Sequence, residues 1–209
     1  MKNTVELLGY YGSDEVIACS AWTSTSRELT DDKKARVGKL IDTLWSQGHE
    51  TPFEKGVLHF LVDTDIASHI HLLKHRISSL NAESARYKEL KEDKYYVPED
   101  WPDAWKERLV DFNNVGNALY HECIKDLEPI IGRKRAKESA RFFKTYNSRI
   151  QADIMFNMRS FGNFQKLRNS EHAQVEIRDI AQQMLSLVEN LWDNPFRHTL
   201  RTWKKNNII

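Results

Sequence analysis

Cysteines and long apolar runs are scarce in this sequence of 209 residues. Its two cysteines, Cys19 and Cys123, form no Cys-x-x-Cys pair, so we expect neither a disulfide framework nor a metal site. No apolar run approaches the roughly 20 residues that cross a bilayer, and the N-terminal residues lack the apolar core of a signal peptide. These absences predict a cytoplasmic protein with reduced thiols and no membrane contact.

An excess of charge of one sign is also missing, because the formal net charge is only +1. Dedicated nucleic-acid-binding domains are usually strongly basic, so no nucleic-acid partner is expected. Any site for a phosphate must then come from a local cluster of cations. Two such clusters stand out, at residues 74–87 and 133–168.

The order of hydrophobic periods predicts one α+β domain over residues 1–209, with a small central sheet and several long helices. No repeat or Gly/Ser/Pro-rich linker divides the chain, and the two prolines of residues 96–102 mark a loop inside it. Helices are predicted over residues 31–47, 66–76, 105–123, 135–146 and 172–192. Strands are predicted over residues 57–62 and 85–88.

The run from Lys74 to Tyr87 holds three cations, a histidine, three serines and an asparagine against a single carboxylate, Glu83. Lys74 and Arg76 lie two residues apart, so on a regular helix they would point in different directions. Near a helix end both could close on a phosphorylated ligand, with the arginine gripping phosphate through two nitrogens. From residue types alone, the favoured explanation is a helix C-terminus that carries cations and is followed by a polar turn.

A second polar run lies between Asn157 and Arg168. At helical spacing Arg159 and Asn163 share a face with Lys166, and phenylalanines lie between them. Hydrogen-bonding groups beside a flat apolar surface suit a pocket for a flavin or pyrimidine ring. An ordinary amphipathic helix is the alternative explanation.

Taken together, these runs resemble the signatures of the flavin-dependent thymidylate synthase family. Residues 74–87 match Arg-His-Arg-x-x-Ser-x-Asn-x-x-Ser-x-Arg-Tyr at every fixed position except the first, where Lys74 stands. Residues 157–168 match Asn-x-Arg-Ser-x-x-Asn-Phe-x-x-Leu-Arg and are followed by a His-Ala-Gln at 172–174. Residues 49–54 match His-Glu-Thr-Pro-Phe-Glu, a run that alone would indicate only a capping loop. The resemblance spans about residues 10–190 in the family's order.

This resemblance implies reductive methylation of deoxyuridylate (dUMP) to thymidylate (dTMP). The implied cofactor is FAD, with 5,10-methylenetetrahydrofolate as carbon donor and NADPH as reductant. It also implies a homotetramer whose active sites form where subunits meet. A near-neutral chain could then still build a positive pocket, because assembly brings its arginines together.

Individual roles follow from the matching positions. Those implied for FAD are Thr51, Lys74, His75, Arg76, Asn157, Arg159 and Asn163, with His49 and His172 near the flavin ring. Those implied for dUMP are His71, Lys74, Glu83, Ser84, Ala85, Arg86, Arg141 and Arg168. Arg168 has the implied catalytic role, since a guanidinium at the N3/O4 edge of uracil would stabilise the negative charge that activates carbon 5. No protein nucleophile is implied, and Ser84 has no base near it in sequence.

Four departures from the family pattern leave other functions open. Lys74 replaces an arginine, His71 stands where a glutamine is usual, Ala82 replaces a glutamate, and Lys55 stands where many members have histidine. One alternative is a related flavoenzyme that acts on another pyrimidine nucleotide or leaves a 5-hydroxymethyl group. Another is a non-catalytic nucleotide- or RNA-binding member of the fold.

Overall fold

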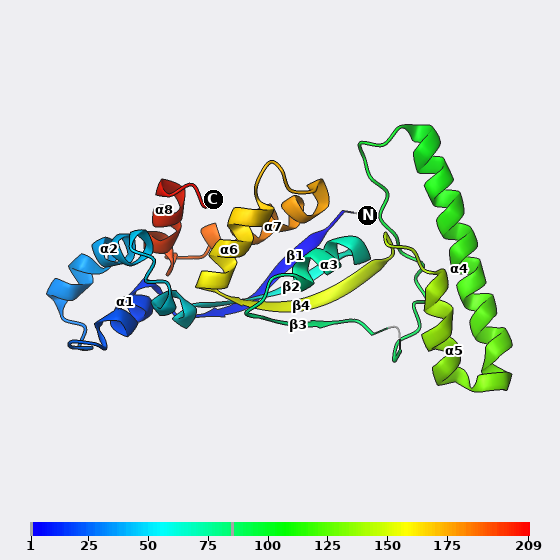
Figure 1. Cartoon of the computed structure of the whole chain (residues 1–209), viewed down its shortest axis with the longest axis horizontal. Coiled ribbons are helices and arrows are strands. Elements are labelled where there is room, and N and C mark those ends of the chain that lie inside the picture. Colours follow the sequence, from blue (N-terminus) through cyan, green and yellow to red (C-terminus); the bar gives the residue numbers. More distant parts are fainter. Residues whose placement is uncertain (1, 85) are drawn as a thin grey trace. The chain divides into compact units, whose positions relative to one another are not determined.

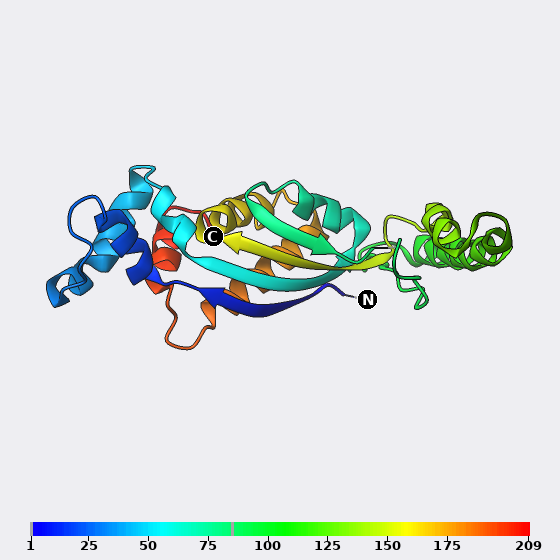
Figure 2. The ribbon, with the colours of Figure 1, turned by 90° about the horizontal axis from the view of Figure 1, so that it is seen from below.

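The fold is organised around a four-stranded sheet of order β1-β2-β4-β3, in a computed structural model that describes residues 2–84 and 86–209 (Figures 1 and 2). The strands are β1 (Thr4–Tyr11), β2 (Val57–Asp65), β3 (Ser78–Ala82) and β4 (Arg149–Asn157). The helices are α1 (Asp14–Trp22), α2 (Asp31–Ser46), α3 (Ile66–Leu73), α4 (Asp103–Ile131), α5 (Arg133–Ala140), α6 (Met158–Arg168), α7 (Val175–Glu189) and α8 (Arg197–Lys205). Short 3-10 turns η1 (Thr51–Lys55) and η2 (Arg141–Phe143) complete the chain. The predicted α+β class with a small sheet is confirmed.

Two compact units divide these elements. Unit 1 comprises residues 1–3, 63–72 and 81–152, and unit 2 comprises residues 4–62, 73–80 and 153–209. Strands β2, β3 and β4 contribute residues to both. That the whole chain acts as one domain stays a prediction.

Helices α6 and α7 lie over the sheet (Figure 1), and unit 2 has an aromatic core between its strands and α6. Phe60 of β2 and Phe156 of β4 are fully buried against Phe161 and Phe164 of α6, with ring centroids 5.2–6.0 Å apart in three of these pairs. Rings at these separations add favourable edge and offset contacts to their burial. This packing fixes the rotation of α6, so that its polar face, with Arg159 and Asn163, is turned away from the core.

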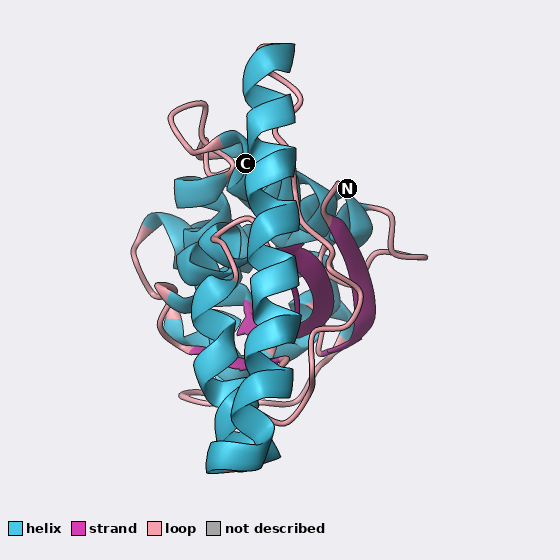
Figure 3. Ribbon diagram, turned by 90° about the vertical axis from the view of Figure 1, so that its right-hand side faces the viewer, coloured by secondary structure: helices cyan, strands magenta, loops and turns pink. Residues whose placement is uncertain are grey.

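Unit 1 is dominated by the hairpin of α4 and α5, which lie side by side in Figure 3. Gly132 separates the two helices with a φ of 79°, a backbone conformation that favours glycine. Tyr120 and Ile124 of α4 pack with Ala140 of α5 in a small apolar cluster. The hairpin therefore has its own core.

Several predicted elements are confirmed by these bounds. Helix α2 begins after Thr30, whose hydroxyl accepts from the Lys33 backbone N–H, and Gly48 follows it with a φ of 72°. Strand β2 and helix α7 lie where they were predicted, α4 contains the predicted residues 105–123 but continues to Ile131, and residues 96–102 form the predicted loop.

Three predictions were wrong in extent or place. The helix predicted to reach Arg76 ends at Leu73, since residues 74–76 already leave the helical path and lead into a turn in which Ile77 takes a φ of 63°. The strand predicted over residues 85–88 is replaced by β3, while Arg86–Lys88 form a turn and Ala85 lies outside the described residues. The helix predicted over residues 135–146 ends at Ala140, since η2 follows and Lys144 is extended.

No strand was predicted at β1 or β4, and no helix at α1 or α8. Among the described residues, no helix is long and apolar enough to cross a membrane.

Candidate functional site

A pocket of about 370 Å³ in unit 2 brings together residues from two distant signatures. Arg76 comes from the run after α3, whereas Asn157, Arg159 and Asn163 come from the N-cap and exposed face of α6. These are four of the nine residues that the sequence predicted for FAD. The other residues lining the pocket are Trp45, Glu50, Ile77, Ser160, Gly162, Lys166 and Ile208.

Asn157 is the N-cap of α6. Its side-chain oxygen accepts from the Ser160 backbone N–H at 2.8 Å, and its extended backbone starts the helix directly after β4. The Met158 N–H donates to the Gly56 carbonyl at 2.8 Å. The second bond ties the start of α6 to the residue that follows η1.

Arg159 is held by two carboxylates from the segment around η1. Its Nε donates to Glu50 at 2.9 Å and its Nη1 donates to Glu54 at 2.8 Å. The hydrogen bonds that Arg159 donates, first to Glu54 and then to Glu50, raise the pKa of Arg159 above its usual value. The guanidinium is therefore held in place, and its single positive charge faces two carboxylates within the protein.

The chain is strained where it enters the pocket. Ile77 has a φ of 63°, which is costly for a β-branched residue, and its side chain is largely exposed at the pocket wall. Such outliers persist only where the surroundings enforce them and gather at functional sites. The turn places Arg76 and Ile77 together on the pocket.

Arg168, the predicted catalytic residue, contacts one of the predicted FAD residues. Its Nε donates to the Nε2 of His75 at 2.9 Å, and the imidazole is buried edge-on against Phe164 at 4.9 Å. His75 must accept through Nε2 in this arrangement, so its ring is neutral there. The terminal nitrogens of Arg168 form no hydrogen bond with any described residue.

Arg86, a predicted dUMP contact in unit 1, is also held by a hydrogen bond from its Nε. Its Nε donates to Glu138 of α5 at 2.9 Å, and its backbone N–H donates to the Ser84 hydroxyl at 3.3 Å. A hydrogen bond and the charge of Glu138 raise the pKa of Arg86, and the same hydrogen bond lowers the pKa of Glu138. Lys137 of α5 also donates to the Tyr87 carbonyl at 3.0 Å. Helix α5 thus anchors the turn that carries Arg86.

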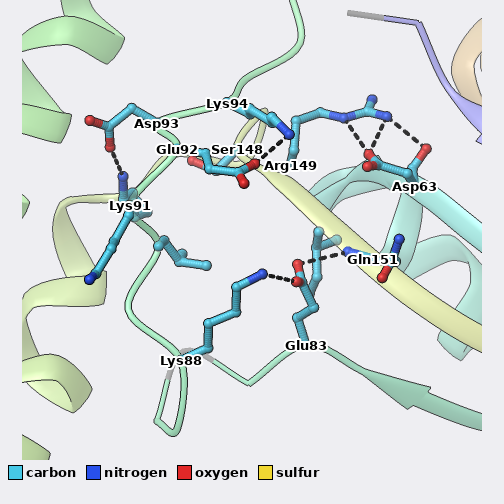
Figure 4. Close-up of a pocket in the computed structure, with 13 residues that line it drawn as sticks. Asp63, Glu83, Lys88, Lys91, Glu92, Asp93, Lys94, Ser148, Arg149 and Gln151 are labelled. Atoms are coloured by element: carbon cyan, nitrogen blue, oxygen red, sulfur yellow. Dashed lines mark hydrogen bonds and ion pairs between the residues drawn. The ribbon is translucent and has the colours of Figure 1, made fainter.

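A second pocket, of about 250 Å³, lies in unit 1 and contains Glu83 (Figure 4). Glu83 accepts from Lys88 at 2.5 Å and from the Gln151 backbone N–H at 3.2 Å. Arg149 and Asp63 form another pair in its wall. Because most of its charges are paired, this pocket offers little uncompensated charge to a ligand.

The remaining predicted residues are not gathered by either pocket. In unit 1, Arg141 begins η2 with an exposed side chain, His71 is half-buried in α3, and Ala85 lies outside the described residues. In unit 2, Lys74, His49, Thr51 and His172 are exposed and do not line the pocket, and His75 and Arg168 also lie outside its lining.

Two pocket residues lie outside every sequence motif, and a third lies inside a motif that assigned it no role. Trp45 belongs to a regular helix, and Ile208 lies near the end of the chain, outside every quoted signature. Glu50 stands inside the His-Glu-Thr-Pro-Phe-Glu run, which signalled the segment but not its role.

Comparisons with known proteins agree with these signatures. Residues 6–192 match the family model described as thymidylate synthase complementing protein. A flavin-dependent thymidylate synthase of Pseudothermotoga lettingae is 33% identical over 186 residues, which cover 86% of this chain and 82% of that protein. Another, from Thermosipho africanus, is 29% identical over 223 residues, which cover 100% of this chain and 95% of that protein.

A solved structure is also similar in fold. The UMP/dUMP methylase PolB from Streptomyces cacaoi, bound with 5-Br dUMP, has a TM-score of 0.78 and 26% identity. The superposition covers 98% of this chain and 95% of that one.

Proposed function

The chain belongs to the thymidylate synthase complementing protein family, and on this premise we propose that it methylates dUMP to dTMP with FAD, 5,10-methylenetetrahydrofolate and NADPH. Membership makes it a methyltransferase, and the family predicted from the motifs is confirmed. The observation that carries the finer proposal is the convergence of Arg76, Asn157, Arg159 and Asn163 on one pocket.

The donor set of this pocket fits a flavin dinucleotide. Cationic and amide side chains suit a diphosphate and ribose, while Trp45, Ile77 and Ile208 offer apolar surface for a flat ring. Arg76, Asn157 and Asn163 would hold the dinucleotide. The bound flavin would supply the hydride that converts the transferred methylene carbon into a methyl group.

Arg168 would activate the pyrimidine. Negative charge must develop on the uracil ring before carbon 5 can attack the carbon donor, and a fixed guanidinium stabilises that charge most when it needs no reorientation. His75 would hold the guanidinium in place, because it accepts from the Nε of Arg168. The two terminal nitrogens of Arg168 are then left for the uracil ring. No covalent attachment of the nucleotide to the protein is needed.

Arg86 would bind the nucleotide phosphate. Glu138 engages its Nε, so the fork of terminal nitrogens that matches two phosphate oxygens stays available. The hydroxyl of Ser84 lies in the same turn, since it accepts from the Arg86 backbone. Arg141 is a further exposed cation for this phosphate.

Self-association is part of the proposal, as a homotetramer with active sites at its interfaces. Helix α4 exposes a stripe of large apolar side chains at helical spacing: Trp105, Phe112, Leu119 and Ile130. An apolar stripe of this length on a soluble chain marks an interaction surface. Sedimentation of the wild type and of Phe112→Glu tests it, since a tetramer should give way to smaller species in the variant. A monomeric wild type would refute it.

A second candidate substrate is UMP, because the similar methylase PolB is described as acting on both UMP and dUMP. Of the departures, His71 is one of the residues predicted for the nucleotide, and Ala82 is adjacent to another, Glu83. Binding and turnover of the two nucleotides therefore need to be compared directly.

Mass spectrometry of the nucleotide product tests the proposal. The protein would be incubated anaerobically with FAD, NADPH, methylenetetrahydrofolate and either dUMP or UMP. Thymidylate, about 14 Da heavier than dUMP by one methylene unit, is the expected product. A hydroxymethyl product, or methylation of UMP alone, would favour one of the alternative activities over thymidylate synthesis. Unchanged nucleotides together with no bound flavin would refute the proposed function.

A further inference from the structure

The charge of the unit 2 pocket is distributed unevenly among its three cations. Arg159 is engaged by both Glu50 and Glu54, so its positive charge is compensated within the protein. Arg76 and Lys166 are exposed, and neither forms an ion pair with any described residue. These two side chains therefore provide the uncompensated positive charge of the pocket.

Lys166 reaches this pocket because of its position on α6. It lies three residues after Asn163, so the two side chains share the polar face that packing of Phe161 and Phe164 turns away from the core. No motif assigned Lys166 a role, since it occupies a variable position of the signature that ends at Arg168.

We infer that Lys166 binds the diphosphate of the dinucleotide cofactor, together with Arg76. This inference rests on the proposed function. A diphosphate carries about two negative charges, which matches the two cations that no carboxylate engages. A lysine ammonium is a compact, strongly hydrated point charge and suits phosphate oxygens, whereas the ring has apolar partners in Trp45, Ile77 and Ile208.

Binding titrations of the flavin-free full chain with three ligands separate the parts of the cofactor. FAD has both the ring and the diphosphate, ADP has the diphosphate without the ring, and riboflavin has the ring alone. The variants are Lys166→Met, which keeps length and helix propensity, and Lys166→Arg, which keeps the charge. Arg76→Met removes the other exposed cation of the pocket, so its effect is the one with which that of Lys166→Met is compared. Lys39→Met, on the exposed face of α2, is the matched control.

We expect Lys166→Met to raise the Kd for FAD and for ADP about tenfold, equivalent to about 1.4 kcal/mol, with riboflavin binding within twofold of wild type. Lys166→Arg and Lys39→Met should bind all three ligands like the wild type. The tenfold ratio should shrink at high salt, because the contact is exposed.

Equal binding of FAD by the wild type and Lys166→Met would overturn the inference while leaving the proposed function intact. A loss shared by riboflavin would also overturn it, because Lys166 would then act on the ring. Absence of FAD binding by the wild type would refute the proposed function and this inference with it. Circular dichroism of each variant ensures that a loss of binding is not a loss of folding.

Discussion

The Nε of Arg168 donates to the Nε2 of His75 at 2.9 Å, across 93 positions of sequence. This bond joins the C-terminal end of α6 to the strained run that follows α3. The Arg86–Glu138 pair repeats the arrangement in unit 1, because Glu138 also engages only Nε. Arg168 and Arg86, two of the three arginines predicted to contact the nucleotide, are thus each held through Nε, whereas Arg159 uses both Nε and Nη1 within the protein.

Replacement of Arg168 by alanine should abolish most turnover while leaving the flavin bound. Removal of one fixed charge-stabilising donor costs about 10²–10³-fold in kcat, and His75 remains in place for the cofactor. The measurement is single-turnover conversion of dUMP beside the flavin absorbance of the purified variant. The turnover of Arg168→Lys should lie between those of the wild type and Arg168→Ala, because lysine keeps the charge but loses the bond to His75. Turnover equal to wild type would remove Arg168 from the chemistry.

Glu138→Gln should raise the KM for dUMP severalfold with little change in kcat. The amide keeps a weaker hydrogen bond to Arg86 but loses the charge that orients the guanidinium. Steady-state kinetics with varied dUMP at saturating folate and flavin would measure this. Glu122→Gln, on the exposed surface of α4, is the matched control. A fall in kcat at unchanged KM would show that Glu138 does not act through nucleotide binding.

The site was predictable where one run of sequence carries all of its groups. Arg159 and Asn163 share a face because both lie on α6, so helical spacing alone brings them together. The partners of Arg159 were not predictable, since Glu50 lies 109 positions away and the contact depends on how η1 packs against α6. The end of α3 was missed for a local reason. The apolar period continues past Leu73, and an isoleucine gives no warning of a left-handed turn at Ile77.

Lys144→Met should destabilise unit 1 by about 2–3 kcal/mol at neutral pH. The buried ammonium donates to Asp93 and to Asn117, each at 2.7 Å, and lies 4.4 Å from the centre of the Tyr120 ring. Its removal leaves the Asn117 side-chain oxygen without its donor and Asp93 with only His121 as a side-chain partner. Urea unfolding followed by circular dichroism would measure the loss, with Lys125→Met on exposed α4 as control. Unfolding indistinguishable from wild type would refute the role of this contact.

The same variant should change the acid sensitivity of folding. Burial raises the pKa of Asp93, but hydrogen bonds from Lys144 and His121 outweigh it and hold the pKa below the usual 3.8. A depressed pKa gives stability that is present above about pH 4 and is lost as pH falls through the folded value. The difference in unfolding free energy between wild type and Lys144→Met should therefore shrink on acidification. A constant difference down to pH 2 would contradict this.

Asp14→Ala should cost unit 2 about 2–3 kcal/mol, because Asp14 caps a helix to which it does not belong. Helix α8 has no side-chain cap of its own. The Asp14 carboxylate, at the start of α1, instead accepts from the backbone N–H groups of His198 at 2.6 Å and Thr199 at 3.1 Å, and from the Thr199 hydroxyl at 2.6 Å. Loss of a cap and of buried hydrogen bonds has costs of this size.

The pH dependence of this cost should have the opposite sign to that of Lys144→Met. Burial raises the pKa of Asp14 above 3.8, and the hydrogen bonds from Thr199 and His198 offset the rise only in part. The folded state therefore binds this proton at a higher pH than the unfolded state. As pH falls from neutral through the folded pKa, wild-type folding gains stability that Asp14→Ala cannot gain. The difference in unfolding free energy between the two should then grow as pH falls toward about 4, and a shrinking difference would mean that the carboxylate is stabilised as an anion.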